Sequence, residues 1–223
     1  MKAEKISEVT TSRLSVYLRC LNELASEGEK TVSSANLEKR FHLNSAQIRK
    51  DLANFGEFGV RGVGYYVKSL RDQLTRILGL DKNHRVCIIG AGRLGTALAD
   101  YYSLKTSNFE VVALFDTDKT KIGKKVGKLK IFDIKNFADA VKRDNIDVAV
   151  IAVPGEFAQK VLEHVTGFGI KAVMNFAPVP LRVSDGVKVK TIDLTISLES
   201  LSCFLAGSNG KNLKPISKNG RIY

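Results

Sequence analysis

The chain has 223 residues, of which 44% are hydrophobic, and a formal net charge of +12. This length allows one large or two small domains, and the hydrophobic content is ordinary for a protein with a sizeable core. No apolar run approaches the roughly 18 residues of a membrane-spanning helix, and the first residues lack the apolar core of a secretory signal. We therefore predict a cytoplasmic protein with no membrane partner.

The positive charge indicates a polyanionic partner, although it does not locate the surface that binds it. Residues 1–84 carry 14 Lys and Arg against 10 Asp and Glu, whereas six lysines fall in the single run 119–130. We interpret this run as a solvated loop. The cysteines are widely separated, so their spacing indicates neither a disulfide framework nor a metal site; they are Cys20, Cys87 and Cys203.

The first eighty residues are predicted to be mainly helical. Apolar residues at helical spacing predict a first helix from about Ser12 that ends at Gly28. A second, short helix is predicted over 34–41, and the turn 42–44 leads into a third helix over 45–55. Two short helices across a tight turn, after an initial helix, are typical of a helix-turn-helix unit.

The third of these helices has one face suited to DNA. Ile48, Leu52 and Phe55 share a face that is predicted to point into the core. Asn44 is predicted to cap the helix start, and Gln47 completes a capping-box pattern. The opposite face combines alanines with polar side chains that can reach base edges or phosphates, although a solvated amphipathic helix would show the same pattern. The candidate DNA contacts on this helix are Ser45, Ala46, Gln47, Arg49 and Lys50.

The next segment, FGEFGVRGVGYYV (55–67), alternates glycine with apolar residues, as a tight β-hairpin does. A hairpin directly after a recognition helix forms the wing of a winged helix. Arg61 is predicted to lie near its tip, where it can enter a narrow minor groove. A last helix is predicted from Ser69, as N-cap, to Gly79, before the polar linker 81–84. The candidate DNA contacts in the hairpin are Arg61, Gly62, Gly64 and Tyr65.

Residues 85–116 have the order of a dinucleotide-binding unit: a buried strand, a glycine turn, a helix and a second strand that ends in an acid. Gly90 permits the tight turn, Gly92 lets the backbone approach a pyrophosphate, and Gly95 lets helix and strand pack closely. The N–H groups at the helix start then face the phosphate, helped by the helix dipole.

The acid at the end of the second strand indicates the kind of nucleotide. Asp116 lies 21 positions after Gly95, where a carboxylate can accept hydrogen bonds from the adenosine ribose. A carboxylate also repels a 2′-phosphate, which favours NAD over NADP. Lys119 and Lys121 follow directly, so NADP is the alternative.

Alternating strands and helices continue through the rest of this half and predict a parallel sheet with helices on both faces. Further strands are predicted over 148–153 and 171–175, with helices over 137–143 and after Pro154. Ligands bind beyond the carboxyl ends of such strands. At the end of the last strand, plain turn chemistry is an equal alternative to a nicotinamide contact. The candidate cofactor-binding residues are Gly90, Ala91, Gly92, Arg93, Leu94, Gly95, Tyr101, Asp116, Val153, Pro154, Asn175 and Phe176.

Four segments resemble, in the same order, the Rex family of redox-sensing transcriptional repressors. They are SAQIRKDLANFGEFGVRGVGYYV (45–67), GAGRLGTALADY (90–101), NFAPVPL (175–181) and TIDLTISLESLS (191–202). The resemblance covers nearly the whole chain except its last fifteen or so residues. It implies a homodimeric repressor that binds a palindromic operator while the cell is oxidised. It further implies that NADH closes the dimer and releases the DNA, whereas NAD+ competes without triggering release.

The resemblance also bears on the end of the chain. The last predicted helix has an apolar face suited to a partner subunit, and the resemblance implies that this helix is exchanged between subunits. It further implies that Arg13 and Asp193 form a charge pair between subunits in one ligand state, whereas Leu194 stands where relatives can have an aromatic residue. We therefore predict an α/β protein with four parts: a winged-helix domain (1–80), a Rossmann domain that binds NADH or NAD+ (81–195), a swapped dimerisation helix (196–207) and a disordered tail (208–223).

The main alternative is a small NAD-dependent oxidoreductase. Tyr101 and Lys105 superficially resemble the catalytic pair of short-chain dehydrogenases, but they follow the first helix of the fold, far upstream of where that pair works. None of the histidines, His42, His84 and His164, is placed where a hydride-transfer acid would be needed. We predict no enzyme, no catalytic residue and no metal. A winged-helix repressor of another adenylate is the second alternative, because a nucleotide-binding fold does not fix its ligand.

Overall fold

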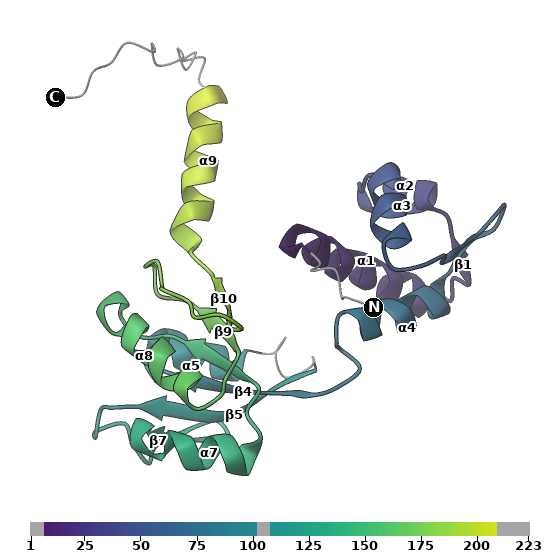
Figure 1. Ribbon diagram of the computed structural model, residues 1–223. Helices are drawn as coiled ribbons and strands as arrows, with labels where there is room; N and C mark the ends of the chain where they lie inside the picture. The colour runs from purple at the N-terminus through teal and green to yellow at the C-terminus, as the bar shows by residue number, and fades with distance from the viewer. Residues whose placement is uncertain (1–6, 102–107, 209–223) are drawn as a thin grey trace. The chain divides into compact units, whose positions relative to one another are not determined.

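The protein is described by a computed structural model that covers residues 7–101 and 108–208 (Figure 1). The chain forms two compact units, Met1–Asn83 and His84–Tyr223. We call them the N-terminal unit and the C-terminal unit.

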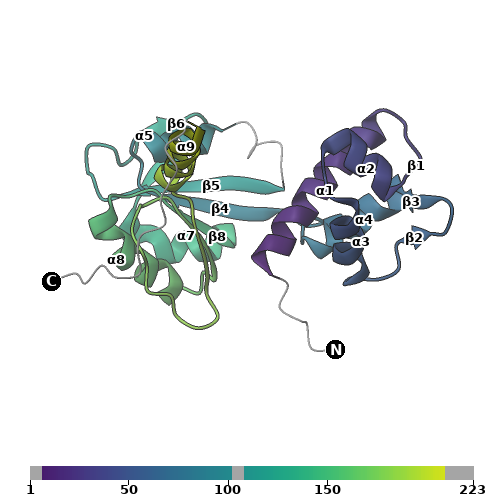
Figure 2. The same cartoon turned by 90° about the horizontal axis from the view of Figure 1, so that it is seen from above.

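From residue 7 on, the N-terminal unit consists of four helices and a small antiparallel sheet (Figure 2). The sheet has the order β1-β3-β2, so the hairpin β2-β3 follows α3 as a wing and pairs with β1 through its second strand. The elements are α1 (Glu8–Ser26), β1 (Thr31–Val32), α2 (Ser34–Phe41), α3 (Ser45–Ala53), β2 (Gly59–Val60), β3 (Gly64–Tyr66) and α4 (Val67–Ile77).

One hydrophobic core holds this unit together, and helix caps fix where its short helices begin. Leu14, Leu21, Ile48 and Leu74 are fully buried in this core. The side chains of Ser33 and Asn44 accept hydrogen bonds from backbone N–H groups at the starts of α2 and α3, which satisfies donors that have no partner within the helix. These caps and the helical spacing explain why the predicted helix-turn-helix is observed.

Three local expectations differ from the structure. The first helix starts earlier than predicted, because Ser7 accepts a hydrogen bond from the Thr10 N–H and caps it. The last helix starts at Val67 instead of after Ser69, since Val67 is buried and its N–H bonds the Lys30 carbonyl as the chain leaves β3. Only half of the predicted capping box forms, because the Gln47 side chain turns along its own helix instead of back to the cap.

The C-terminal unit contains a seven-stranded sheet of order β10-β9-β8-β4-β5-β7-β6. Its strands pair in parallel except β6, which pairs antiparallel with β7. Strand order reverses between β4 and β8, as in a doubly wound Rossmann sheet. The elements are β4 (His84–Ile89), α5 (Arg93–Asp100), β5 (Phe109–Asp116), β6 (Lys125–Val126), β7 (Leu129–Asp133), η1 (Ile134–Asn136), α7 (Phe137–Asp144), β8 (Val148–Ile151), α8 (Gly155–Gly167), β9 (Ala172–Asn175), β10 (Lys188–Thr191) and α9 (Leu194–Ser208).

Alternating side chains of the central strand lie in two separate cores, one on each face of the sheet. Cys87 and Ile89 pack in a core that includes residues of α7 and α8. Val86 and Ile88 pack in a second core that includes Ala99 of α5. Because both faces are covered, β4 is apolar at successive positions, which is the pattern expected of a buried parallel strand.

The sequence-based element assignment was incomplete at three places. The lysine run predicted to be a solvated loop contains β6 and the start of β7, and β10 was not predicted. His84, placed in the linker, is the first residue of β4. Within residues 7–101 and 108–208, no helix is long and apolar enough to cross a membrane.

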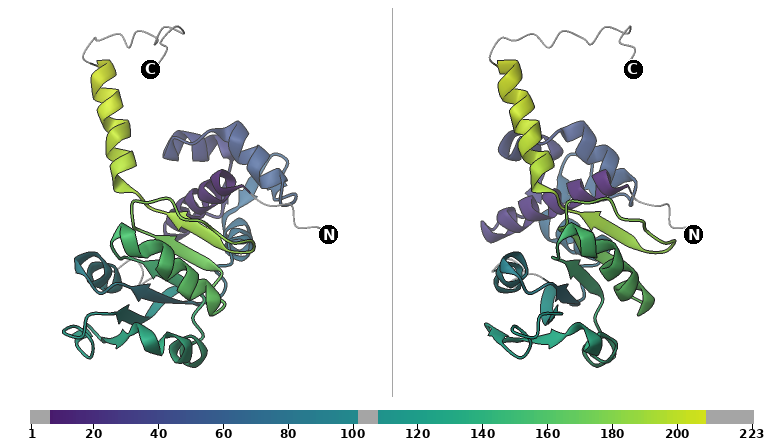
Figure 3. Two further views of the ribbon diagram at one scale, coloured as in Figure 1. Left: turned by 60° about the vertical axis from the view of Figure 1, so that its left-hand side comes forward. Right: turned by 90° about the vertical axis from the view of Figure 1, so that its left-hand side faces the viewer.

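The last helix, α9, is drawn in yellow in Figure 3. Its large apolar side chains are exposed. Their exposed fractions lie between 59% and 70%, for Leu194, Ile196, Leu198, Leu201, Phe204 and Leu205. Residues 209–223, which include most of the predicted tail, lie outside the described part of the chain.

Candidate functional site

The glycine turn between β4 and α5 is too crowded for larger residues at two of its positions. Gly90 has φ +103°, and a Cβ there would lie 2.4 Å from the Ala152 carbonyl oxygen. A Cβ on Gly95 would lie 1.8 Å from the Gly90 carbonyl oxygen, so α5 can pack on the turn only with glycine at this position. Gly92 precedes the first residue of α5, and the space where its Cβ would lie is open. The turn therefore presents bare backbone at a helix N-terminus, which suits a phosphate.

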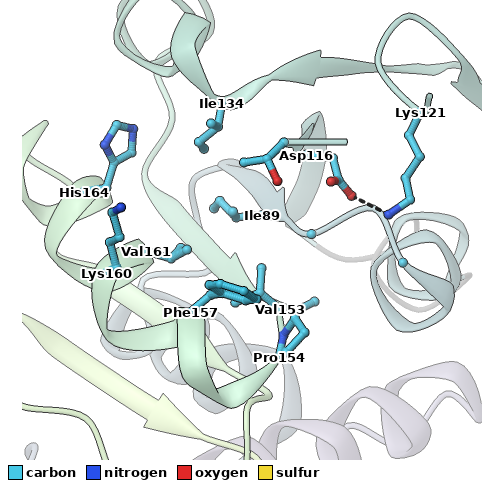
Figure 4. A pocket seen from close by; sticks show the side chains of 14 residues that line it. Ile89, Asp116, Lys121, Ile134, Val153, Pro154, Phe157, Lys160, Val161 and His164 are labelled. Carbon is cyan, nitrogen blue, oxygen red and sulfur yellow. Dashed lines mark hydrogen bonds and ion pairs between the residues drawn. The ribbon is translucent and has the colours of Figure 1, made fainter. Parts of the chain in front are cut away.

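A pocket of about 650 Å³ lies at the carboxyl ends of β4, β5 and β8 (Figure 4). This is the reversal point of the sheet, where open α/β sheets bind their ligands. Five predicted cofactor-binding residues line the pocket: Gly90, Gly92, Asp116, Val153 and Pro154. The helix start, the carboxylate and the apolar walls together suit the phosphate, ribose and base of a dinucleotide.

Asp116, at the end of β5, is held by donors on both sides. Its Oδ2 accepts the Ala91 N–H at 2.9 Å and lies 3.0 Å from Lys121 Nζ, and its Oδ1 accepts the Asp118 N–H at 2.9 Å. Burial opposes the charge of this carboxylate, but these hydrogen bonds outweigh burial and lower the pKa of Asp116. Asp116 is therefore an ionised acceptor in the pocket wall at neutral pH.

Other predicted cofactor residues lie at the edge of this site or in the core. Arg93 and Leu94 are exposed on the first turn of α5, and Tyr101, at its C-terminal end, is 57% exposed. Asn175 is fully buried and its side-chain amide exchanges hydrogen bonds with the Ala177 backbone, which is the turn chemistry that the sequence left open. Phe176 packs on the core that contains α5. Lys105 lies outside the described residues.

The sequence did not single out the wall of the pocket that α8 supplies. Phe157 of this helix is 52% exposed and lines the pocket with Lys160 and His164 (Figure 4). The His164 ring packs against Phe137 and Phe168. The sequence carried one signal for this wall. Because α8 begins directly after the pocket residue Pro154, side chains on its first turns lie close to the pocket.

The predicted DNA contacts separate into exposed and buried groups. On α3, Ala46, Arg49 and Lys50 are exposed, and the Arg49 guanidinium bonds the Ser34 hydroxyl at 2.9 Å. Ser45 and Gln47 are half-buried on the same helix.

In the wing, Arg61 and Gly62 are exposed between β2 and β3, and Gly62 has φ +80°. A Cβ on Gly64 would lie 2.5 Å from the Val32 carbonyl oxygen, so this glycine is required by the pairing with β1. Tyr65 is only 8% exposed and belongs to the core, because its side chain points inward where β3 pairs with both neighbours. Tyr66 is the exposed tyrosine of the wing.

A buried carboxylate ties the predicted recognition helix to α1. Asp51 of α3 is 2% exposed and accepts two hydrogen bonds from the Arg13 guanidinium, at 2.5 and 2.7 Å. It also accepts the Tyr17 hydroxyl at 2.9 Å and the Gln47 side-chain amide at 2.8 Å. The Arg13 bonds lower the pKa of Asp51, whereas burial and the bond to Asp51 raise the pKa of Tyr17 to about 12. Gln47, one of the predicted DNA contacts, thus donates a side-chain hydrogen bond within its own domain.

The two residues of the predicted charge pair between subunits each have a partner within the chain. Arg13 bonds Asp51, as described above. Asp193 accepts the Thr195 N–H at 2.8 Å, at the start of α9. Among the described residues, no group of three or more His, Cys, Asp and Glu is arranged to hold a metal ion.

Comparisons with known proteins match both units. Residues 81–179 match a family described as a CoA binding domain, and residues 5–53 match one described as a putative DNA-binding protein N-terminus. The redox-sensing transcriptional repressor Rex of Carboxydothermus hydrogenoformans is 46% identical over 91% of this chain and 97% of its own length. Rex 1 of Thermotoga maritima is 43% identical over 90% of this chain and 96% of its own. The chain belongs to the Rex family.

Solved structures agree with this Rex assignment over the same length. RSP in complex with β-NAD+ and operator DNA has a TM-score of 0.88 and 37% identity, and covers 92% of this chain and 95% of that one. RSP in complex with β-NADH has a TM-score of 0.81 and 35% identity, with 92% and 97% covered. The combination of winged-helix and Rossmann units is therefore that of a Rex-family repressor, and the oxidoreductase alternative is set aside.

Proposed function

We propose that this chain forms a homodimeric repressor that binds a palindromic operator in the oxidised state and leaves it when NADH binds. The observation that carries the proposal is the pocket at the reversal point of the sheet, with its glycine turn and ionised Asp116, in the same chain as a winged helix. Of its relatives, RSP has been solved with β-NAD+ and operator DNA and with β-NADH. Because the operator lies on cellular DNA, we place the protein in the cytoplasm.

In this proposal each unit supplies one binding site. The exposed face of α3, with Lys50, lies in the major groove, and Arg61 of the wing contacts the neighbouring minor groove. The glycine turn binds the pyrophosphate and Asp116 binds the adenosine ribose. The two sites are coupled because NADH favours the dimer arrangement whose recognition helices do not match successive major grooves.

Operator binding by fluorescence anisotropy tests the proposal. A palindromic, AT-rich duplex and a scrambled duplex are titrated with the full-length protein at one fixed salt concentration, since phosphate contacts make the affinity strongly salt-dependent. We expect specific binding of the palindrome, release on adding NADH, and no release on adding NAD+, which instead competes with NADH. If the protein binds the palindrome specifically but neither NADH nor NAD+ changes its affinity, it is a DNA-binding protein that responds to another ligand. Equal affinity for both duplexes would contradict the repressor.

A further inference from the structure

The hairpin formed by β6 and β7 has an apolar face and a lysine face. Val126 and Leu129 are paired across the hairpin, and both pack against the core that contains residues of α5. Lys125 and Lys130 form the adjacent pair, so their side chains point away from that core, because side chains alternate along a strand. We call the four exposed lysines of this hairpin and its flank the hairpin surface: Lys124, Lys125, Lys128 and Lys130.

The positive charge of the hairpin surface is not neutralised by the protein. Residues 119–130 contain six lysines and no acidic residue. Within the described part of the chain, the ion pairs of this segment involve Lys121 alone. Lys125 and Lys130 are direct cross-strand partners, and like charges placed opposite each other destabilise a hairpin. A bound polyanion would remove this repulsion.

Protection of the sheet edge does not account for these charges. Lysines on an edge strand discourage pairing with another chain, and β6 is an edge strand of this sheet. Lys130, however, lies on β7, which has β5 on one side and β6 on the other. Lys128 lies in the turn between β6 and β7. Half of the hairpin surface is therefore placed where it protects no edge.

The residue types of the segment indicate which polyanion it fits. Lysine ammonium groups pair with phosphate as hydrated point charges. Residues 119–130 contain no arginine, asparagine or glutamine to read base edges, and no aromatic side chain on which single-stranded bases stack. A membrane-binding surface inserts apolar side chains, whereas Val126 and Leu129 face the core. The hairpin surface therefore suits the phosphate backbone of duplex DNA, contacted without reading its sequence.

We propose that the hairpin surface binds the phosphate backbone of duplex DNA, as a second DNA contact outside the winged helix. Residues 85–223 carry 21 Lys and Arg against 13 Asp and Glu, so most of the net charge of +12 lies outside the N-terminal unit. Phosphate contacts supply sequence-independent binding, which lets a protein slide and hop along DNA. The inference goes beyond the proposed function, because it requires neither an operator nor NADH.

Binding of a long scrambled duplex by the full-length protein tests this surface. Fluorescence anisotropy is measured over a series of salt concentrations for the wild type and two triple variants. The hairpin variant combines Lys125→Gln, Lys128→Gln and Lys130→Gln. The matched control removes the same charge from three exposed lysines elsewhere in the C-terminal unit, with Lys135→Gln, Lys142→Gln and Lys171→Gln.

We expect the hairpin variant to bind the scrambled duplex about tenfold or more weakly at low salt. The slope of log affinity against log salt should fall by about two to three, because three phosphate contacts are lost. The control should stay within about threefold of the wild type, with an unchanged slope. Lys128→Gln alone, in the turn where no strand pairing is disturbed, should lower the slope by about one. Urea denaturation should show that the hairpin variant is folded, since it loses the repulsion between Lys125 and Lys130.

Unchanged binding of the scrambled duplex by the hairpin variant, or equal weakening in the control, would overturn the inference. Two further measurements identify what the lysines do in that case. Self-association of the hairpin variant in sedimentation velocity would mean that they protect the sheet edge. Loss of binding to vesicles of phosphatidylcholine and phosphatidylserine, with duplex binding unchanged, would mean a membrane partner.

The proposed function is tested separately, by the preference for the palindrome and by release on adding NADH. A protein without that preference, whose binding of scrambled duplex still depends on the hairpin surface, would contradict the proposed function and support this inference. A protein with the preference, whose hairpin variant binds scrambled duplex as the wild type does, would do the reverse.

Discussion

Asp51 carries a charge in a position that is 2% exposed, and its side chain faces α1 instead of the solvent. Burying a carboxylate is costly unless donors surround it. Arg13, Tyr17 and Gln47 supply those donors, and the first two come from residues 38 and 34 positions away in the sequence. Local spacing cannot reveal such partners, so the sequence identified the buried face of α3 through Ile48 and Leu52 but missed Asp51. The network fixes the position of α3 relative to α1.

Asp51→Asn is expected to lower the free energy of unfolding by about 2–4 kcal/mol at neutral pH, because Arg13 loses its charged partner. The pKa of Asp51 is lowered by folding. Its contribution to stability is therefore present above the ordinary carboxylate pKa of about 4 and is lost as the pH falls through the lower, folded value. Urea denaturation followed by circular dichroism, at fixed protein concentration between pH 7 and pH 3, measures both effects.

The matched control for this variant is Asp72→Asn, because Asp72 also pairs with an arginine, Arg71 at 3.3 Å, but has a side chain that is 48% exposed. We expect its effect to stay below about 1 kcal/mol, as for exposed ion pairs. In Asp51→Asn the loss of stability on acidification becomes shallower, since the group that takes up the proton is gone. An Asp51→Asn protein that is as stable as the wild type at pH 7 would contradict a stabilising role of the network.

At the scale of elements, the sequence predicted correctly the elements whose signals lie in a few neighbouring residues. The helix caps Ser33 and Asn44, the glycine-rich wing and the glycine turn after β4 all have signals within a few residues. The strands that were missed, β1, β6, β7 and β10, alternate lysine with apolar residues or are only two residues long. Such strands occur near sheet edges, where charge discourages further pairing, and a polar segment there resembles a loop. These strands form by pairing with other strands of a sheet, and such pairing cannot be recognised from the few residues of the strand itself.

The recognition helix and the wing support one prediction together. Lys50 lies exposed on α3 and Arg61 exposed at the wing tip. We expect Lys50→Ala and Arg61→Ala each to weaken operator binding about tenfold, and loss of a phosphate contact to reduce the slope of log affinity against log salt by about one. NADH affinity should stay nearly the same, because neither residue lines the dinucleotide pocket. Anisotropy over a series of salt concentrations measures affinity and slope.

A lysine of the other unit separates this effect from a general loss of positive charge. Lys142 is exposed on α7, outside the winged helix, and Lys142→Ala should bind the operator as the wild type does. Equal weakening in all three variants would mean that net charge, not the position of Lys50 and Arg61, determines DNA affinity.

At the scale of the whole molecule, α9 is the element whose exposed apolar surface no contact within the single chain explains. Its six large apolar side chains are 59–70% exposed, although both faces of the sheet have their own cores. Soluble proteins rarely expose a contiguous apolar surface of this kind unless a partner covers it. The apolar face was visible in the sequence, but only the family resemblance assigned it to exchange between subunits, because an interface between copies leaves no local signal of its own. A second copy of the chain is the partner that we propose, since a palindromic operator requires two-fold symmetry.

Phe204→Glu is expected to dissociate this dimer. Phe204 is the most exposed of the six side chains, at 70%, and a carboxylate in an apolar interface should raise the dimer dissociation constant about a hundredfold or more. The monomer should lose the palindrome's advantage over a half-site, since only two linked winged helices can bind both halves at once. NADH binding should persist, because none of the residues that line the pocket lies on α9. Phe204→Leu, which keeps an apolar side chain, should remain dimeric. Sedimentation velocity measures the assembly and anisotropy the DNA binding. A Phe204→Glu protein that stays dimeric and binds the palindrome normally would show that α9 is not the dimer contact.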